Sequence, residues 1–218
     1  MNMSSSGTAG PMAMVQAPNI NKQVDVLEKL YNKKKYSQVI DEGWKIVRSW
    51  NRKVERIQAT ADLWKFMGLA YFQLKDFNGA RACFGNAIVT IPEDSEAMIG
   101  RGMAYFAMNK MEEAEKDLEA ALKIKSDDAK ALILMAAVYA VKKETKKASE
   151  FAKKAASKDP KLAIDVCTSM IDAYYDNMRC TNTERMQLMK MKKDLKEEMK
   201  RLIKEAKESL KSEKLNKK

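Results

Sequence analysis

The chain has 218 residues, enough for one substantial domain or a short array of repeats. It contains no histidine, which excludes His-dependent catalytic triads, H-E-x-x-H zinc sites and Cys/His fingers. Hydrophobic residues make up 45% of the chain and charged residues 33%, with a formal net charge of +11 and only 8 Gly and 4 Pro. Because the abundant residues Ala, Leu, Lys, Glu and Met favour helix and turn-forming residues are scarce, we expect an all-α fold.

The cysteines and the apolar runs point to a cytoplasmic protein. Cys83, Cys167 and Cys180 form neither a CxxC pair nor an even disulfide framework, so we expect free thiols. No run of 18 apolar residues is present, so the sequence predicts no transmembrane helix. We also expect no cofactor and no metal site.

A tail and a helix pair come first in chain order. Residues 1–20 carry no charged side chain and are rich in small and polar residues, which predicts a disordered tail rather than a signal peptide. Residues 21–60 predict a divergent helix pair, since the apolar spacing within 36–46 recurs within 77–87. That offset is 41 residues rather than 34, so we expect an elongated second helix or linker. We interpret Trp44 and Trp50 as packing residues.

Residues 61–162 then repeat with a period of 34 residues. The first copy, 61–94, carries a set of aromatic, small and turn residues: Trp64, Gly68, Tyr71, Ala80, Phe84, Ala87 and Pro92. The copies at 95–128 and 129–162 place matching residues in the same slots: Gly102, Tyr105, Ala114 and Ala121, then Ala136, Tyr139, Ala148, Ala155 and Pro160. This pattern resembles the tetratricopeptide repeat family. The resemblance implies a right-handed α-solenoid of antiparallel helix pairs whose role is to bind other proteins.

The small residues have a physical role in such a pair, because they let the two helix backbones approach closely. A Leu in place of Gly68 or Ala80 would overpack the crossing, at a cost of roughly 1–3 kcal/mol. Pro92 and Pro160 are expected to end the second helix of their repeats. The middle repeat has no proline in that slot, so Ser126, Asp127 or Asp128 is expected to cap the next helix.

Two further helices are predicted after the repeats. Residues 163–180 form an amphipathic helix that we expect to cap the last repeat. Residues 181–218 predict a long, basic amphipathic helix, and apolar residues recur on one of its faces: Leu188, Met191, Leu195, Met199, Leu202, Ala206 and Leu210. This face is a candidate second contact surface. It could pack on the chain's own solenoid, pair with another copy or another helix, or lie on an anionic membrane.

The positive charge lies at the two ends of the chain. Residues 22–57 carry a net charge of +5, residues 58–183 a net charge of zero, and residues 184–218 a net charge of +6. Such flanks raise the alternative of a nucleic-acid or ribosome-associated factor that uses the repeats as a dock. Interleaved acidic residues, the excess of Lys over Arg and the lack of interleaved aromatic residues favour solvated helix surfaces instead.

The family resemblance implies a concave groove lined by the first helix of each repeat. Carried onto this sequence, the candidate partner-binding positions are Lys65, Leu69, Phe72, Gln73, Ile99, Met103, Phe106, Lys130, Ile133, Ala137 and Val141. Most are apolar, which favours a ligand with apolar side chains or an amphipathic helix. Co-chaperone members of the family grip a carboxylate with Lys, Asn and Arg, but here those slots hold Lys65, Leu69, Gly100, Lys130 and Leu134, so such a clamp is disfavoured.

No motif of an enzyme accompanies the repeats. The sequence lacks a Gly-rich phosphate loop and a GxSxG element, and carboxylate pairs such as Glu112/Glu113 and Asp127/Asp128 fit helix starts and surfaces. The sequence therefore predicts a non-catalytic scaffold, adaptor or assembly factor. Its expected partner is a protein, bound as a peptide or an amphipathic helix, and self-association through the last helix is a further possibility.

Overall fold

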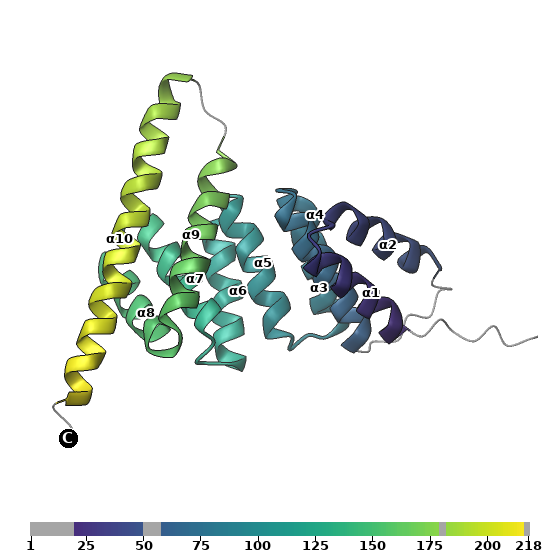
Figure 1. The fold of residues 1–218 in the computed structure, drawn as a ribbon, viewed down its shortest axis with the longest axis horizontal. Helices are drawn as coiled ribbons and strands as arrows, with labels where there is room; N and C mark the ends of the chain where they lie inside the picture. Colours follow the sequence, from purple (N-terminus) through teal and green to yellow (C-terminus); the bar gives the residue numbers. More distant parts are fainter. Residues whose placement is uncertain (1–19, 50–57, 179–181, 216–218) are drawn as a thin grey trace, which may run out of the picture.

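The computed structural model describes residues 20–49, 58–178 and 182–215, and these residues form an all-α fold without a strand in those ranges (Figure 1). The helices of the described residues are α1 (Ile20–Asn32), α2 (Tyr36–Ser49), α3 (Gln58–Gln73), α4 (Phe77–Thr90), α5 (Ser95–Ala107), α6 (Met111–Ile124), α7 (Ala129–Val141), α8 (Thr145–Lys158), α9 (Pro160–Asp176) and α10 (Asn182–Leu215). Helices α1 to α8 form pairs that stack side by side. The fold class that the family resemblance implies is confirmed: the described helices form an α-solenoid of antiparallel helix pairs.

The turn inside each pair has one recurring conformation. Lys34, Lys75, Asn109 and Lys143 all have φ between 58° and 61°, in the left-handed region. At the second pair the Lys75 N–H donates to the Phe72 carbonyl and the following N–H donates to the Tyr71 carbonyl, both at 3.0 Å. This is a Schellman motif, which satisfies carbonyls at a helix end. The same backbone bonds recur in the other three turns, so each first helix ends in the same way.

The connections between pairs end in aspartate caps. Asp94 accepts a hydrogen bond from the Ala97 N–H at 2.9 Å at the start of α5, and Asp128 accepts from the Lys130 and Ala131 N–H groups at the start of α7. Of the three capping residues considered from sequence, Asp128 therefore has this role. Helices α4 and α8 end at Thr90 and Lys158, each two residues before the expected proline. Pro160 also occupies the first turn of α9, where its missing N–H costs no hydrogen bond.

Small residues let neighbouring helices approach each other around Phe84. A Cβ atom at Gly68 of α3 would lie 3.0 Å from the Phe84 ring, and one at Gly100 of α5 would lie 2.4 Å from it. Phe84 itself is 2% exposed. The ring of α4 therefore packs against two glycines in two different repeats, and this packing joins the first full repeat to the next.

The first pair packs against α3, with Leu27 of α1 and Val39 of α2 fully buried. The described part of α2 ends at Ser49 and α3 begins at Gln58, so the elongated second helix or linker expected for this pair falls on the residues between them and stays a prediction. Those residues, 50–57, lie outside the described part of the chain together with Trp50. Trp44 donates from Nε1 to the Tyr71 hydroxyl at 2.9 Å and contacts the Trp64 ring edge-on.

Helix α9 packs against α7, and α10 lies along α8 and α9 (Figure 1). Leu195, Met199 and Ile203 of α10 are buried, with exposed fractions of 8%, 1% and 1%. Lys192 pairs with Asp172 at 2.8 Å, and Lys196 pairs with the same carboxylate at 2.5 Å. The described part of the apolar face of α10 is thus covered by the chain's own solenoid.

Candidate partner-binding groove

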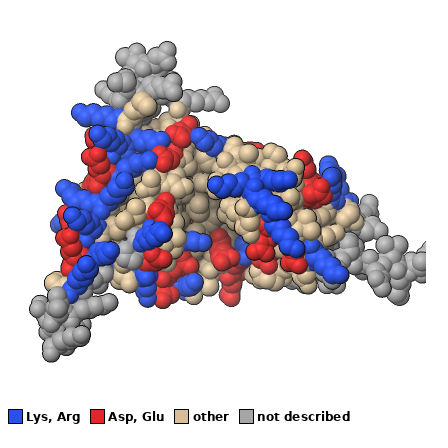
Figure 2. Space-filling model, viewed as in Figure 1, with Lys and Arg blue, Asp and Glu red and all other residues tan. Residues whose placement is uncertain are grey.

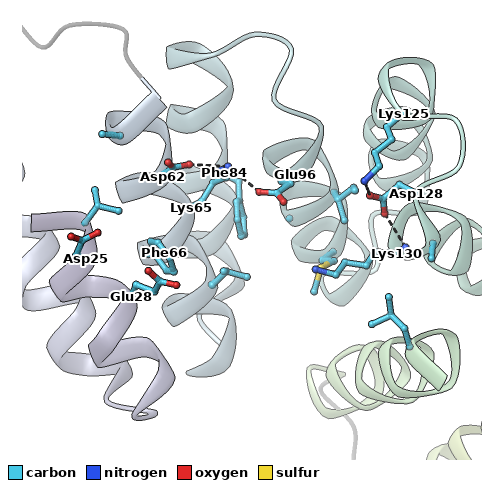
Figure 3. A pocket seen from close by; sticks show the side chains of 18 of the residues that line it. Asp25, Glu28, Asp62, Lys65, Phe66, Phe84, Glu96, Lys125, Asp128 and Lys130 are labelled. Atoms are coloured by element: carbon cyan, nitrogen blue, oxygen red, sulfur yellow. Dashed lines mark hydrogen bonds and ion pairs between the residues drawn. The ribbon is translucent and has the colours of Figure 1, made fainter. Parts of the chain in front are cut away.

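The first helices of successive pairs enclose a hollow of about 820 Å³. Helices α1, α3 and α5, the start of α7 and Leu162 of α9 contribute to it (Figure 3). Its apolar lining comprises Val24, Ala59, Phe66, Leu69, Phe84, Ile99, Gly100, Met103, Ala129 and Leu162. Its charged lining comprises Asp25, Glu28, Asp62, Glu96, Asp128, Lys65, Lys125 and Lys130. We call this hollow the groove.

Lys65 lies at the centre of an ion-pair cluster in the groove (Figure 3). Its Nζ lies 3.0 Å from Asp62, 3.1 Å from Asp94 and 3.0 Å from Glu96, and its side chain is 14% exposed. Burial alone would lower the pKa of Lys65, but hydrogen bonds to Glu96, Asp62 and Asp94 raise that pKa above its usual value. Lys65 is therefore a protonated amine already bound by carboxylates, and it ties α3 to the start of α5.

The other two lysines lie at the far side of the groove, near the start of α7. Lys125 pairs with Asp128 at 3.3 Å, while Asp128 also caps α7. Lys130 is exposed, and its Nζ has no ion pair with any residue in the ranges that the structure describes. Lys130 is the one groove amine whose charge is not already matched by a described carboxylate.

The structure places only part of the predicted positions in the groove. Lys65, Leu69, Ile99, Met103 and Lys130 line it. The remaining predicted positions lie elsewhere: Phe72, Phe106, Ile133 and Ala137 are buried, Gln73 is exposed outside the groove, and Val141 is half-buried outside it.

For Ile133 and Ala137 the reason is the packing around α7, where every residue from Ala131 to Ala140 is buried because α6, α8 and α9 all pack against this helix. Phe72 and Phe106 are buried against neighbouring rings, those of Phe77 and Tyr174 respectively. The open part of the groove is therefore shifted toward α1. Sequence reasoning missed Asp25, Glu28 and Phe66, although Glu28 lies four residues after Val24 and three after Asp25, and Phe66 lies three residues before Leu69.

Four of the five carboxylate-clamp slots hold a residue that is already paired, buried or apolar. Lys65 already contacts three carboxylates, and Leu134 is 1% exposed in the core. Leu69 and Gly100 line the groove where a clamp would need polar donors.

The predicted second contact face is only partly described. Leu195 and Met199 are buried and Leu202 is half-buried against α8 and α9. The side chains of Leu188, Met191, Ala206 and Leu210 lie outside the described residues. The exposed side of α10 mixes both charges, with pairs such as Lys193–Glu197 and Arg201–Glu205, so Figure 2 shows basic and acidic side chains intermingled there.

The described ranges hold few other groups of the kinds that bind metals or act as nucleophiles. No group of three His, Cys, Asp or Glu side chains in them could hold a metal ion, and none of their helices is long and apolar enough to cross a membrane. Cys83 and Cys167 are free and buried, and burial raises the pKa of each thiol to about 12. Neither thiol is therefore activated as a nucleophile. Cys180 lies outside the described residues.

The comparisons with known proteins agree with the geometry. A tetratricopeptide repeat family model matches residues 67–129 and again residues 101–163. No curated protein matches the chain. Among solved structures, the chain is similar to the MamA protein, with 21% sequence identity and a TM-score of 0.58. The match covers 89% of this chain and 94% of the MamA chain.

Two bacterial structures show the same fold. A thermophilic tetratricopeptide repeat protein of Thermus thermophilus is 13% identical over 81% of this chain and 98% of its own, with a TM-score of 0.55. A tetratricopeptide repeat protein of Parabacteroides merdae is 14% identical over 91% of this chain and 86% of its own, with a TM-score of 0.56. At these identities the likeness concerns the fold alone. The family match over residues 67–163 and the stacked helix pairs show that this part of the chain consists of tetratricopeptide repeats.

Proposed function

We propose that the protein is a non-catalytic scaffold or adaptor that holds a partner protein by a peptide or an amphipathic helix in the groove. The observation that carries this proposal is the groove itself: an apolar floor with a charged rim, open across the first helices of several pairs. Its volume of about 820 Å³ lies within the range of pockets that bind ligands of moderate size. The role is proposed for the cytoplasm, which suits the free thiols of Cys83 and Cys167.

The shape of the groove favours a segment of protein over a small metabolite. Leu69 and Met103 present half-buried apolar side chains, and charged side chains surround them from α1 to α7. An amphipathic segment can bury its apolar side chains on such a floor while its polar ones stay at the rim. The flexible thioether of Met103 suits side chains of different shapes.

The test is a selection of binders from a random peptide display library, using the full chain as bait. Each binder is then measured against Leu69→Ser/Met103→Ser, which removes apolar contacts of the floor. The matched control is Val89→Ser, because Val89 of α4 is 65% exposed and does not line the groove. We expect binders that lose at least tenfold in affinity with the double variant and keep their affinity with the control. If every binder tolerates the double variant, the groove is not the binding site.

A further inference from the structure

The charge on the groove is opposite in sign to that of the whole chain. Its lining carries five carboxylates, Asp25, Glu28, Asp62, Glu96 and Asp128, against the three amines of Lys65, Lys125 and Lys130. The chain as a whole has a net charge of +11. Because salt screens charges beyond about 8 Å at physiological ionic strength, a bound segment responds mainly to this local acidic lining.

Two of these carboxylates are available to a ligand. Asp25 and Glu28 are exposed, and neither has an ion pair or a hydrogen bond with a residue in the described ranges. They are three residues apart on α1, so they lie one above the other on the same helix face. Figure 3 shows both on the α1 side of the groove, next to Phe66. A cationic side chain bound there would have two carboxylates at one end and an aromatic ring beside it.

The cluster around Lys65 adds to this polarity. One amine is shared there by Asp62, Asp94 and Glu96, so the cluster keeps a net charge of −2. Glu96 is the most open member, with 75% of its side chain exposed. The acidic character therefore continues from α1 across α3 to the start of α5.

We propose that the segment held in the groove carries lysine or arginine side chains next to its apolar ones, and that Asp25 and Glu28 bind them. This inference rests on the proposed function. The apolar floor holds the apolar side of the segment, and the α1 carboxylates fix its orientation. An acidic segment would instead meet repulsion from α1 and find one amine, Lys130, without a described carboxylate partner.

The same peptide selection provides the test, because it yields ligands that can be synthesised. Binders that require Leu69 and Met103 are labelled with fluorescein and titrated by anisotropy against the full chain and against Asp25→Asn/Glu28→Gln. The matched control is Asp41→Asn/Glu150→Gln, which removes one exposed Asp and one exposed Glu outside the groove. Circular dichroism establishes that each variant keeps its helix content.

We expect groove binders enriched in Lys and Arg, with affinity reduced about fivefold by Asp25→Asn/Glu28→Gln at low salt and unchanged by the control. The difference between the full chain and this variant should disappear at high salt, since exposed ion pairs are screened. Neutral or acidic groove binders, or binders weakened by Lys130→Gln but not by Asp25→Asn/Glu28→Gln, would overturn the inference and leave the proposed function standing. If no binder depends on Leu69 and Met103, the proposed function fails and the inference with it.

Discussion

The packing of α10 on the solenoid gives the most quantitative prediction. Met199 lies on the buried face of this helix and is 1% exposed, whereas Met189 of the same helix is 59% exposed. The substitutions Met199→Ala and Met189→Ala therefore remove the same atoms from two very different surroundings. Met199 packs in the core that includes Cys167, Met170 and Ile171 of α9.

The expected cost follows from this difference in burial. Replacing a buried Met by Ala removes its transfer free energy and leaves a cavity, together about 2–5 kcal/mol. The exposed site should stay within about 0.5 kcal/mol, because surface substitutions away from special features have small effects. For a chain of this size, a loss of about 3 kcal/mol lowers Tm by roughly 6–12 °C.

The assay is urea unfolding followed by circular dichroism, with amide hydrogen exchange to resolve α10. If α10 opens separately from the repeats, Met199→Ala should increase exchange in α10 and α9 before it changes the overall transition. Equal, small effects of Met199→Ala and Met189→Ala would refute the account, since they would mean that α10 does not pack on α8 and α9. Its apolar face would then be open for self-association or another partner.

Three further predictions concern the turns and the ion pairs. Lys143 has a φ of 61° and an exposed side chain. Lys143→Gly should raise the free energy of unfolding by about 0.5 kcal/mol, because relief of left-handed strain exceeds the entropic cost of glycine. Lys146→Gly in α8, the control, should lower the free energy of unfolding. Asp117→Ala should lower the free energy of unfolding, measured with urea, by about 2 kcal/mol, because Asp117 accepts two hydrogen bonds from Arg101 at 2.7 Å. Glu119→Ala, at an exposed position of the same helix, should change that free energy little. Burial would raise the pKa of Asp172, but hydrogen bonds from Lys192 and Lys196 lower it below its usual value. The anchoring of α10 should thus be fully present at neutral pH and weaken as pH falls below about 4, so that exchange in α10 rises there in the native chain and less so in Asp172→Asn.

The fold class could be predicted from the sequence because each repeat places small and aromatic residues at the same interval. Gly68, Gly102 and the buried Ala80 and Ala114 fall in slots where only small side chains fit, and a recurrence of 34 residues leaves few alternatives. The turn conformations could not be predicted from the sequence, because Lys75 and Lys143 take a left-handed conformation that glycine or asparagine would more often adopt.

The groove could be predicted only in its central part. Family positions treat every repeat alike. They put Lys65, Leu69 and Met103 in the groove, but Phe72 and Phe106 of the same repeats are buried against neighbouring rings. The ends of the array differ, since α9 covers Ile133 on one side and α1 supplies Asp25 on the other. Which helix covers which face depends on packing between distant segments, and a repeat pattern carries no information about that.

Binding of the partner in the groove is tested most directly by amide hydrogen exchange of the full chain with and without a groove-selected peptide. We expect added protection in α1, α3 and α5, whose side chains line the groove. Helices α8 and α10, which do not line it, should be unchanged. Protection confined to α8 and α10, with none in α1, α3 or α5, would contradict the claim that the groove holds the partner.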